Sequence, residues 1–179
     1  MNDLILIAIR EEAPALAGLA HVFFTGVGKV NAALTAARLI EKHRPQRIWN
    51  FGTAGGITVA GGLHRCTRFL QRDMLVTALG FPPGQTPYED GLAIEMGTGG
   101  LTCGSGDSFV TDSALHLPSD VVDMEAYALA KACHRAGILF HCYKFISDRA
   151  DEASGGDWTA NVQKGEPSYL EVLRQNGLA

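Results

Sequence analysis

The sequence predicts a mixed α/β sandwich with a central, largely parallel sheet. A continuous apolar run at Leu4–Ile9 is typical of a strand that is buried on both faces. Apolar residues then recur at helical spacing from Val30 to Ile40, and Pro45 ends that helix. Strands and helices continue to alternate along the chain, and this alternation favours a parallel sheet.

The remaining elements follow from the same patterns. Further strands are expected at His21–Thr25, Arg47–Phe51, Leu63–Gln71, Leu92–Glu95, Leu101–Cys103, Asp120–Val122 and Leu139–Ile146, and helices at Met124–Arg135 and Tyr169–Gln175. Glycine-rich turns are expected at Thr25–Gly28 and Gly52–Gly56, and the proline-rich segment Gly80–Asp90 is expected to be an irregular loop. The two glycine turns let backbone N–H groups approach a ligand, but neither is a dinucleotide fingerprint or a P-loop. We find no linker or repeat, so we expect one domain over residues 1–179.

Composition excludes several classes of function. The chain has 179 residues, of which 46% are hydrophobic, so it can bury a sizeable core and is not expected to be disordered. Its net charge of −4 is small. Lysine and arginine are scattered, so neither nucleic acid nor an anionic membrane surface is an expected partner. The Leu4–Ile9 run is too short to span a membrane and has no basic leader before it. We therefore expect a cytoplasmic protein.

Cysteine and histidine spacing gives no sign of a metal site. Cys66, Cys103, Cys133 and Cys142 form no C-x-x-C pair, and no two histidines are spaced as H-x-x-x-H. Free, buried thiols are the expected state of the cysteines. We expect no metal and no cofactor.

Two acidic residues stand at the ends of predicted strands. Asp148 comes two residues after the predicted strand Leu139–Ile146, and Glu125 follows the strand Asp120–Val122. In α/β proteins ligands bind at the carboxyl ends of the strands, so the pair favours a polar ligand held between the two acids. Position alone fits helix caps or solvated loop acids equally well.

Six short segments, taken in order, resemble one family. They are Glu11-Glu12, Thr25–Ala33, Asn50–Gly56, Ser105–Val110, Val122–Ala126 and Ile146–Asp148. Together they are similar to the nucleoside phosphorylase and nucleosidase superfamily, and within it to a shortened form of the 5′-methylthioadenosine/S-adenosylhomocysteine nucleosidases. The resemblance runs from Leu4 to about Trp158. It implies a three-layer αβα sandwich of the phosphorylase/hydrolase type and cleavage of the N-glycosidic bond of a purine nucleoside.

The resemblance also bears on the attacking group. The phosphorylases have a phosphate-binding arginine two residues before the glycine that matches Gly52, and this chain has Asn50 there. The turn Gly26–Lys29 also lacks arginine. Phosphate would miss its bidentate partner, which favours water as the nucleophile and hydrolysis as the reaction. A phosphate-dependent phosphorylase and a catalytically silent nucleoside-binding module are the alternatives.

The matched positions imply a role for each site residue. Asp148, oriented by Ser147, matches the acid that protonates N7 of the leaving purine, because a purine anion is a poor leaving group. Glu12 matches the carboxylate that positions and deprotonates water, and Glu125 the one that binds the ribose hydroxyls. The other implied substrate contacts are Ile9, Val27, Thr53, Ala54, Gly55, Phe109, Val110, Asp123, Met124 and Trp158. Trp158 is expected on a mobile loop with Gly155-Gly156 as its hinge.

A homodimer with shared pockets is expected from the apolar, proline-rich segment Val76–Pro87. The matching loop of the resembled nucleosidases reaches into the neighbouring subunit's site, which implies that Val76, Leu79 and Pro87 contact the partner's substrate. Alternatively, Phe81 and the prolines cover an edge of the chain's own sheet. Apolar Ile9, Val27 and Leu79 favour a nucleoside with an apolar 5′ end, and no clamp for a 5′-phosphate is visible.

Overall fold

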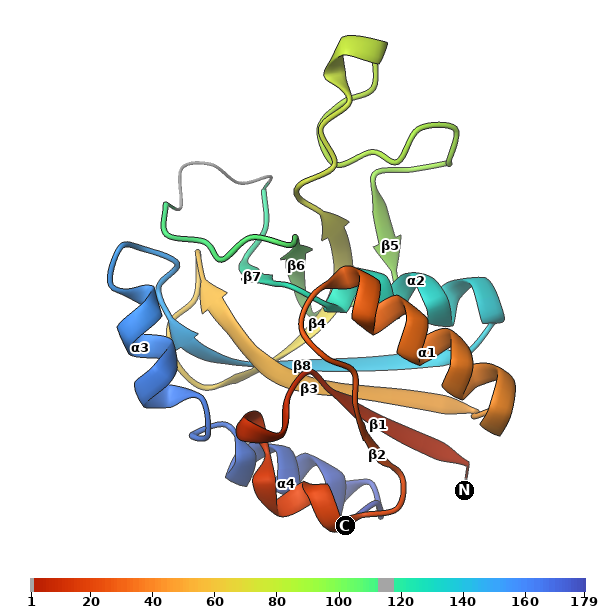
Figure 1. Cartoon of the computed structure of the whole chain (residues 1–179), viewed down its shortest axis with the longest axis vertical. Helices are drawn as coiled ribbons and strands as arrows, with labels where there is room; N and C mark the ends of the chain where they lie inside the picture. The colour runs from red at the N-terminus through yellow and green to blue at the C-terminus, as the bar shows by residue number, and fades with distance from the viewer. Residues whose placement is uncertain (1, 113–117) are drawn as a thin grey trace.

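The computed structural model describes residues 2–112 and 118–179, and within them eight strands form one mixed sheet (Figure 1). The strands are β1 Asp3–Ile7, β2 Val22–Phe24, β3 Arg47–Gly56, β4 Leu63–Gln71, β5 Ala93–Glu95, β6 Leu101–Ser105, β7 Val121–Asp123 and β8 Leu139–Asp148. The α-helices are α1 Lys29–His43, α2 Ala126–Ala136, α3 Ser154–Asn161 and α4 Glu166–Gln175. Short 3-10 turns, η1 Arg10–Glu12, η2 Pro14–Gly18 and η3 Thr77–Leu79, complete the chain.

The sheet is mostly parallel, as predicted. Its order is β2-β1-β3-β7-β6-β4-β5, and β8 pairs with both β3 and β4. Strand β1 pairs in parallel with β2 and β3, and β8 pairs in parallel with β3, whereas β7 runs antiparallel to β3. The pairings of β3, β7, β6, β4 and β8 close into a ring, which local sequence patterns do not predict because every one of these contacts is long-range in the chain.

Helices cover both faces of β1, β3 and β8. In β1 the side chains of Leu4 and Leu6 join the apolar cluster that includes buried residues of α1 and α2. Ile5 and Ile7 point to the opposite face and join a second cluster with Tyr169 of α4. This alternation is what a strand with a period of two residues produces when both of its faces are buried. Figure 1 shows α1 and α2 on one side of these strands and α4 on the other, so the three-layer prediction is confirmed.

The predicted turn at residues 52–56 is wrong, because β3 continues through it to Gly56. These residues pair with β8 from Gly52 opposite Lys144 to Gly55 opposite Asp148, with one register shift. Glycine is needed here for close packing. A Cβ on Gly56 would lie 2.1 Å from the carbonyl oxygen of Val59, which is far inside van der Waals contact.

The segment after Asp148 also differs from its prediction. It forms the helix α3 and not a loop, and Gly155-Gly156 lie in the first turn of that helix. Asn161 holds α3 against the sheet, since its side-chain amide donates to the backbone oxygen of Ser147 at 2.6 Å. The predicted loop is therefore wrong, and the role of Gly155-Gly156 as a hinge stays a prediction.

The start of α2 lies two residues after its predicted position. A carboxylate oxygen of Asp123 accepts the backbone N–H of Ala126 at 2.9 Å and satisfies the first turn of the helix. Met124 and Glu125 consequently lie before the helix, at the end of β7. The four cysteines are free and buried, as predicted. In the described part of the chain, no helix is long and apolar enough to cross a membrane.

Candidate active site

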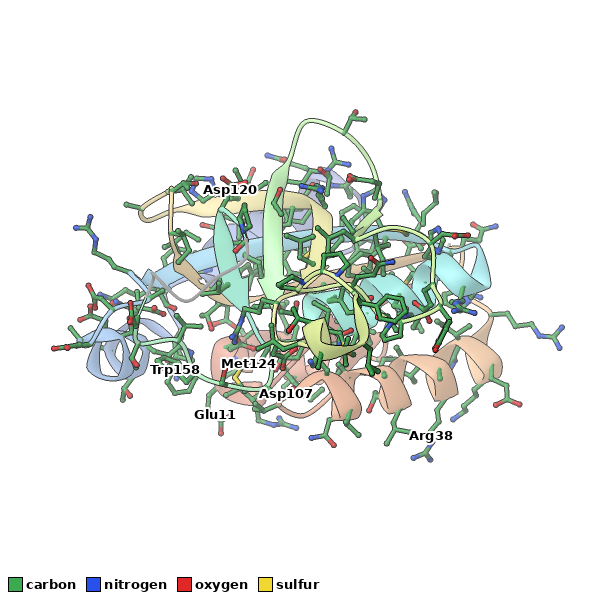
Figure 2. The ribbon with its side chains drawn as sticks, turned by 90° about the horizontal axis from the view of Figure 1, so that it is seen from above. Glu11, Arg38, Asp107, Asp120, Met124 and Trp158 are labelled. Atoms are coloured by element: carbon green, nitrogen blue, oxygen red, sulfur yellow. The ribbon has the colours of Figure 1, made fainter. Side chains whose placement is uncertain are left out.

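A cavity of about 90 Å³ opens where β3, β7 and β8 meet η1 and α3. Its wall contains every contact that the sequence predicted from the chain's own residues, namely Ile9, Glu12, Val27, Thr53, Ala54, Gly55, Phe109, Val110, Asp123, Met124, Glu125, Ser147, Asp148 and Trp158. In Figure 2, Met124 and Trp158 lie near each other and far from Arg38 on α1. Residues from distant parts of the sequence thus come together at one edge of the sheet.

Glu12 is buried at the end of η1, directly after β1. Its Oε1 accepts two hydrogen bonds from Thr53 of β3, one from the backbone N–H at 2.7 Å and one from the hydroxyl at 2.8 Å. Burial raises the pKa of Glu12 above its ordinary value, against the opposing effects of Lys144 and the Thr53 bonds. A carboxylate with a raised pKa is a better proton acceptor, as a general base requires.

Gly52 makes room for this arrangement. A Cβ at Gly52 would lie 3.2 Å from Glu12 Oε1, which is tight, and 3.4 Å from Lys144 Nζ, so a larger residue would crowd the Glu12 carboxylate. Lys144 lies on β8 opposite Gly52 and forms an ion pair with Asp123 of β7, with 2.8 Å between Nζ and Oδ2. Burial disfavours the ammonium, but the surrounding acidic groups, with the Asp123 carboxylate contributing most, together outweigh burial and raise the pKa of Lys144 well above its usual range.

Glu125 lies between the end of β7 and the first residue of α2. Its Oε1 accepts the backbone N–H of Gly28 at 2.8 Å, in the glycine turn before α1. Burial, with Asp123 close by, raises the pKa of Glu125 to about 7. This acid therefore exchanges its proton near neutral pH.

Asp148 ends β8 and is held on both of its carboxylate oxygens. The Ser147 hydroxyl donates to Oδ2 at 2.8 Å, and the backbone N–H of Ala150 donates to Oδ1 at 2.9 Å. Gly55 faces Oδ1 from β3, where any Cβ would lie 2.8 Å away. The carboxyl group is thus fixed in one orientation beside the cavity.

Comparison with known proteins places the chain in a family. Residues 16–175 match the family model described as the phosphorylase superfamily. The chain belongs to this superfamily. It is 30% identical to a 5′-methylthioadenosine/S-adenosylhomocysteine nucleosidase of Shewanella oneidensis over 178 residues, covering 83% of this chain and 75% of the relative. It is 32% identical to the enzyme of that name from Actinobacillus succinogenes over 158 residues, covering 73% and 68%.

Solved structures of the superfamily share the fold. A Helicobacter pylori nucleosidase mutant with 5′-methylthioadenosine in its active site superposes with a TM-score of 0.86 at 22% identity, covering 97% of this chain and 98% of that one. A futalosine hydrolase mutant of the same organism gives a TM-score of 0.83 at 22% identity, covering 92% and 93%. At such identities the match establishes the mixed α/β fold.

The sequence analysis did not predict four residues of the cavity wall: Ala8, Arg72, Ser108 and Val122. Arg72 follows β4, and its guanidinium donates to the backbone oxygens of Gly106 and Ser108 and to the Ser108 hydroxyl. It fixes the segment that carries Phe109 and Val110 at the cavity wall. A basic residue one position beyond a predicted strand was the available signal.

The three residues expected to reach a partner's pocket, Val76, Leu79 and Pro87, do not line this chain's own cavity. They lie on the segment between β4 and β5, which projects away from the sheet in Figure 1. Leu75 and Leu79 on this segment are 68% and 69% exposed. Apolar side chains this exposed remain in contact with water, so they contribute little to the stability of the single chain.

Proposed function

We propose that this chain hydrolyses the N-glycosidic bond of a purine nucleoside, with water as the attacking group. The observation that carries the proposal is the pair of buried carboxyl groups, Glu12 and Asp148, in the wall of one cavity. Glu12, with its raised pKa, takes a proton from water. Asp148 delivers a proton to N7 of the purine, so that the base leaves as a neutral molecule.

The sugar and the base are held by neighbouring residues. Glu125 accepts hydrogen bonds from the ribose hydroxyls, and Met124 lies beneath the sugar. Phe109 stacks on the base from the segment that Arg72 fixes, and the backbone of Val110 contacts the base. These assignments agree with the common position of all four residues in the cavity wall.

The environment of Asn50 favours water over phosphate. Its side-chain amide donates to the backbone oxygen of Leu6 at 2.9 Å, and its Oδ1 lies 3.3 Å from the Cys142 thiol that donates to it. Asn50 is buried and is not part of the cavity wall. Among the described residues of that wall, the basic side chain is Arg72, and its guanidinium is already bonded to Gly106 and Ser108. A phosphate anion would find no unengaged bidentate partner there.

The substrate we propose is 5′-methylthioadenosine, S-adenosylhomocysteine or a related 5′-modified adenosine. Support comes from the apolar Ile9 and Val27 in the cavity wall and from the names of the curated relatives. A 5′-phosphate would meet these apolar side chains, so nucleotides such as AMP should be poor substrates.

The test is incubation with methylthioadenosine, S-adenosylhomocysteine, inosine, adenosine and AMP, with and without phosphate. We expect the free base and the free sugar to appear at the same rate in both conditions. Ribose 1-phosphate that forms only with phosphate would replace this proposal by phosphorolysis. Nucleoside binding without any base release would replace it by a binding module.

Variants connect the activity to the two carboxyl groups. Glu12→Gln and Asp148→Asn should each lower kcat by about 10²- to 10⁴-fold, as expected for general base and general acid groups. Glu11→Gln is the matched control, because Glu11 is the adjacent exposed carboxylate on the same turn. Full activity in Glu12→Gln, or an equal loss in Glu11→Gln, would contradict the assignment.

We also propose that two chains form a homodimer in which the segment between β4 and β5 completes the partner's pocket. Exposed apolar side chains on this segment, Leu75 and Leu79, are accompanied by exposed Val30 and Leu34 on α1. Apolar surface of this kind is typical of an interface. The segment projects from the fold (Figure 1), which disfavours the alternative that it covers an edge of its own sheet.

A further inference from the structure

Three residues from distant parts of the chain form a continuous hydrogen-bond chain beside the cavity. The indole Nε1 of Trp158, on α3, lies 3.0 Å from Oγ1 of Thr53 on β3. The same Oγ1 lies 2.8 Å from Oε1 of Glu12, and the backbone N–H of Thr53 donates to that oxygen as well. The helix that closes the cavity is therefore bonded, through one hydroxyl group, to the proposed base.

The direction of these bonds is fixed by the chemistry of the groups. An indole N–H only donates, so the Thr53 hydroxyl oxygen accepts from Trp158. An ionised carboxylate only accepts, so the single hydroxyl proton of Thr53 points to Glu12. Hydrogen bonds to a charged group are stronger than those between neutral groups. A hydroxyl whose oxygen accepts a bond from the indole N–H is also less free to rotate its proton away from Glu12.

We propose that Trp158 is a positioning residue, whose indole N–H fixes the Thr53 hydroxyl as a donor to Glu12 when α3 packs over the cavity. This inference rests on the proposed function, since it assigns to Glu12 the role of base. It goes beyond covering the cavity, because a phenylalanine ring covers the same surface without donating a hydrogen bond. The Asn161 bond to the backbone of Ser147 holds α3 in the position from which Trp158 reaches Thr53.

The consequence for Glu12 has a definite sign. Its neighbours are Thr53 on β3, Lys144 on β8 and the backbone N–H of Ile9, all of which lower its pKa against the larger effect of burial. Glu125 before α2 and Tyr169 on α4 also interact with its charge. When the Thr53 donor is lost, burial is opposed less and the pKa of Glu12 rises further. The ionised base then appears only at higher pH.

The first experiment is the pH profile of kcat/KM for Trp158→Phe, Thr53→Val and the double variant. Trp158→Phe should move the acidic limb of the profile to higher pH. At pH values on the acidic side of that limb, kcat/KM should fall by about threefold to tenfold, which is the change in rate that the loss of one hydrogen bond produces. Thr53→Val should move the limb in the same direction. The double variant should show no shift beyond that of Thr53→Val, because Trp158 acts only through the hydroxyl.

Two control variants separate this role from packing. Thr53→Ser keeps the hydroxyl and should keep the limb at the position found in the unmodified enzyme. Thr159→Ala alters the residue next to Trp158 on α3, whose hydroxyl bonds the backbone oxygen of Gly155, and should leave the limb unchanged. An unshifted limb in Trp158→Phe, or shifts that add in the double variant, would overturn the proposal.

A second measurement does not depend on turnover. In ligand-free protein labelled with ¹³C at the glutamate carboxyl carbons, the Glu12 resonance is the one that disappears in Glu12→Gln. Its titration midpoint should rise in Trp158→Phe and in Thr53→Val. A shifted midpoint in a protein that cleaves no nucleoside would support the hydrogen-bond chain and refute the proposed function. Turnover with an unshifted midpoint would refute the role of Trp158 and retain the function.

Discussion

The Nζ atom of Lys144 lies 2.8 Å from Oδ2 of Asp123, and these side chains are only 2% and 1% exposed. The ion pair joins β8 to β7 beside the cavity, whose wall includes Asp123. Asp123 also accepts the hydroxyl of Ser105 and the backbone N–H of Ala126. Three donors therefore bind the Asp123 carboxylate, and they offset the free-energy cost of burying its charge.

Removal of one member of this pair tests its contribution to stability. Lys144→Met should lower the free energy of unfolding by about 3–5 kcal/mol, because it leaves the Asp123 charge buried without its partner. Urea denaturation gives the value. The control is Arg68→Met, which breaks an exposed pair with Glu95 and should cost about 1 kcal/mol or less. Asp123→Asn added to Lys144→Met should recover part of the loss, and equal losses in the buried and exposed pairs would contradict this prediction.

Glu125 makes stability depend on pH. Its pKa of about 7 in the folded protein lies above the ordinary value of 4.5, so the folded state binds this proton more tightly than the unfolded state. The stability that Glu125 contributes as an uncharged acid is therefore present below about pH 4.5 and is lost as the pH rises to about 7. The glutamine of Glu125→Gln cannot ionise, so this variant keeps that stability at every pH.

We accordingly expect Glu125→Gln to unfold at higher urea concentration than the unmodified protein at pH 8, with a gain of about 3 kcal/mol for this shift in pKa. At pH 4 the two proteins should be nearly equal. Glu41→Gln, on the exposed face of α1, is the control for a glutamate-to-glutamine change. A gain of the same size at both pH values would show that ionisation of Glu125 is not the cause.

Local patterns predicted most of the fold, and the failures have physical causes. The continuous apolar run that begins at Leu4 and the helical spacing after Val30 each appear in a short stretch of sequence, so β1 and α1 were predicted within a few residues. Residues 52–56 were taken for a turn because glycine carries no side chain that could alternate. Their strand conformation depends on pairing with β7 and β8, far along the chain. Helix α3 was missed because Gly155 and Gly156 are weak helix formers.

The candidate site was predicted in a different way. Position alone left Asp148 and Glu125 open to other interpretations, and the ordered resemblance to one family singled them out with Glu12. The roles of these residues stay predictions, although the structure brings them into one cavity wall. The place of Arg72 directly after a predicted strand was a local signal, but its hydrogen bond to Gly106 and the contact of Trp158 with Thr53 depend on how distant elements pack.

Gly55 tests how closely β3 must approach Asp148. In Gly55→Ala the new Cβ would lie 2.8 Å from Oδ1 of Asp148 and 3.0 Å from the Cβ of Ala150, so the carboxylate must move. We expect kcat to fall by about 10²-fold, as for a misplaced catalytic group. The free energy of unfolding should fall by about 1–3 kcal/mol from overpacking.

Gly156→Ala is the matched control, because this helical position has no neighbour within 4 Å of an added Cβ. It should raise the free energy of unfolding by about 0.5–1 kcal/mol through better helix propensity and leave kcat unchanged. Nucleoside turnover and urea denaturation measure the two effects. Normal turnover in Gly55→Ala would mean that Asp148 tolerates displacement, which would argue against its role as the acid.

Leu79 tests the proposed dimer. It is 69% exposed on the projecting segment between β4 and β5, and Leu75 on the same segment is 68% exposed. If this segment enters the partner's pocket, Leu79→Asp places a charge against apolar surface that the interface would desolvate. We expect sedimentation at micromolar concentration to show a dimer for the unmodified chain and a monomer for Leu79→Asp. Turnover should fall with association, since the pocket then loses the residues supplied by the partner.

A matched surface change distinguishes the interface from a general effect of charge. Leu139→Asp alters an apolar side chain that is 62% exposed at the first residue of β8, whereas Asp148 is the last residue of that strand. This variant should leave both association and turnover unchanged. A Leu79→Asp protein that is still dimeric and fully active would show that the segment has no part in a shared pocket. A monomer that keeps full activity would show that each chain completes its own site, in which case the cavity formed by Glu12, Asp148 and Trp158 is sufficient for the reaction.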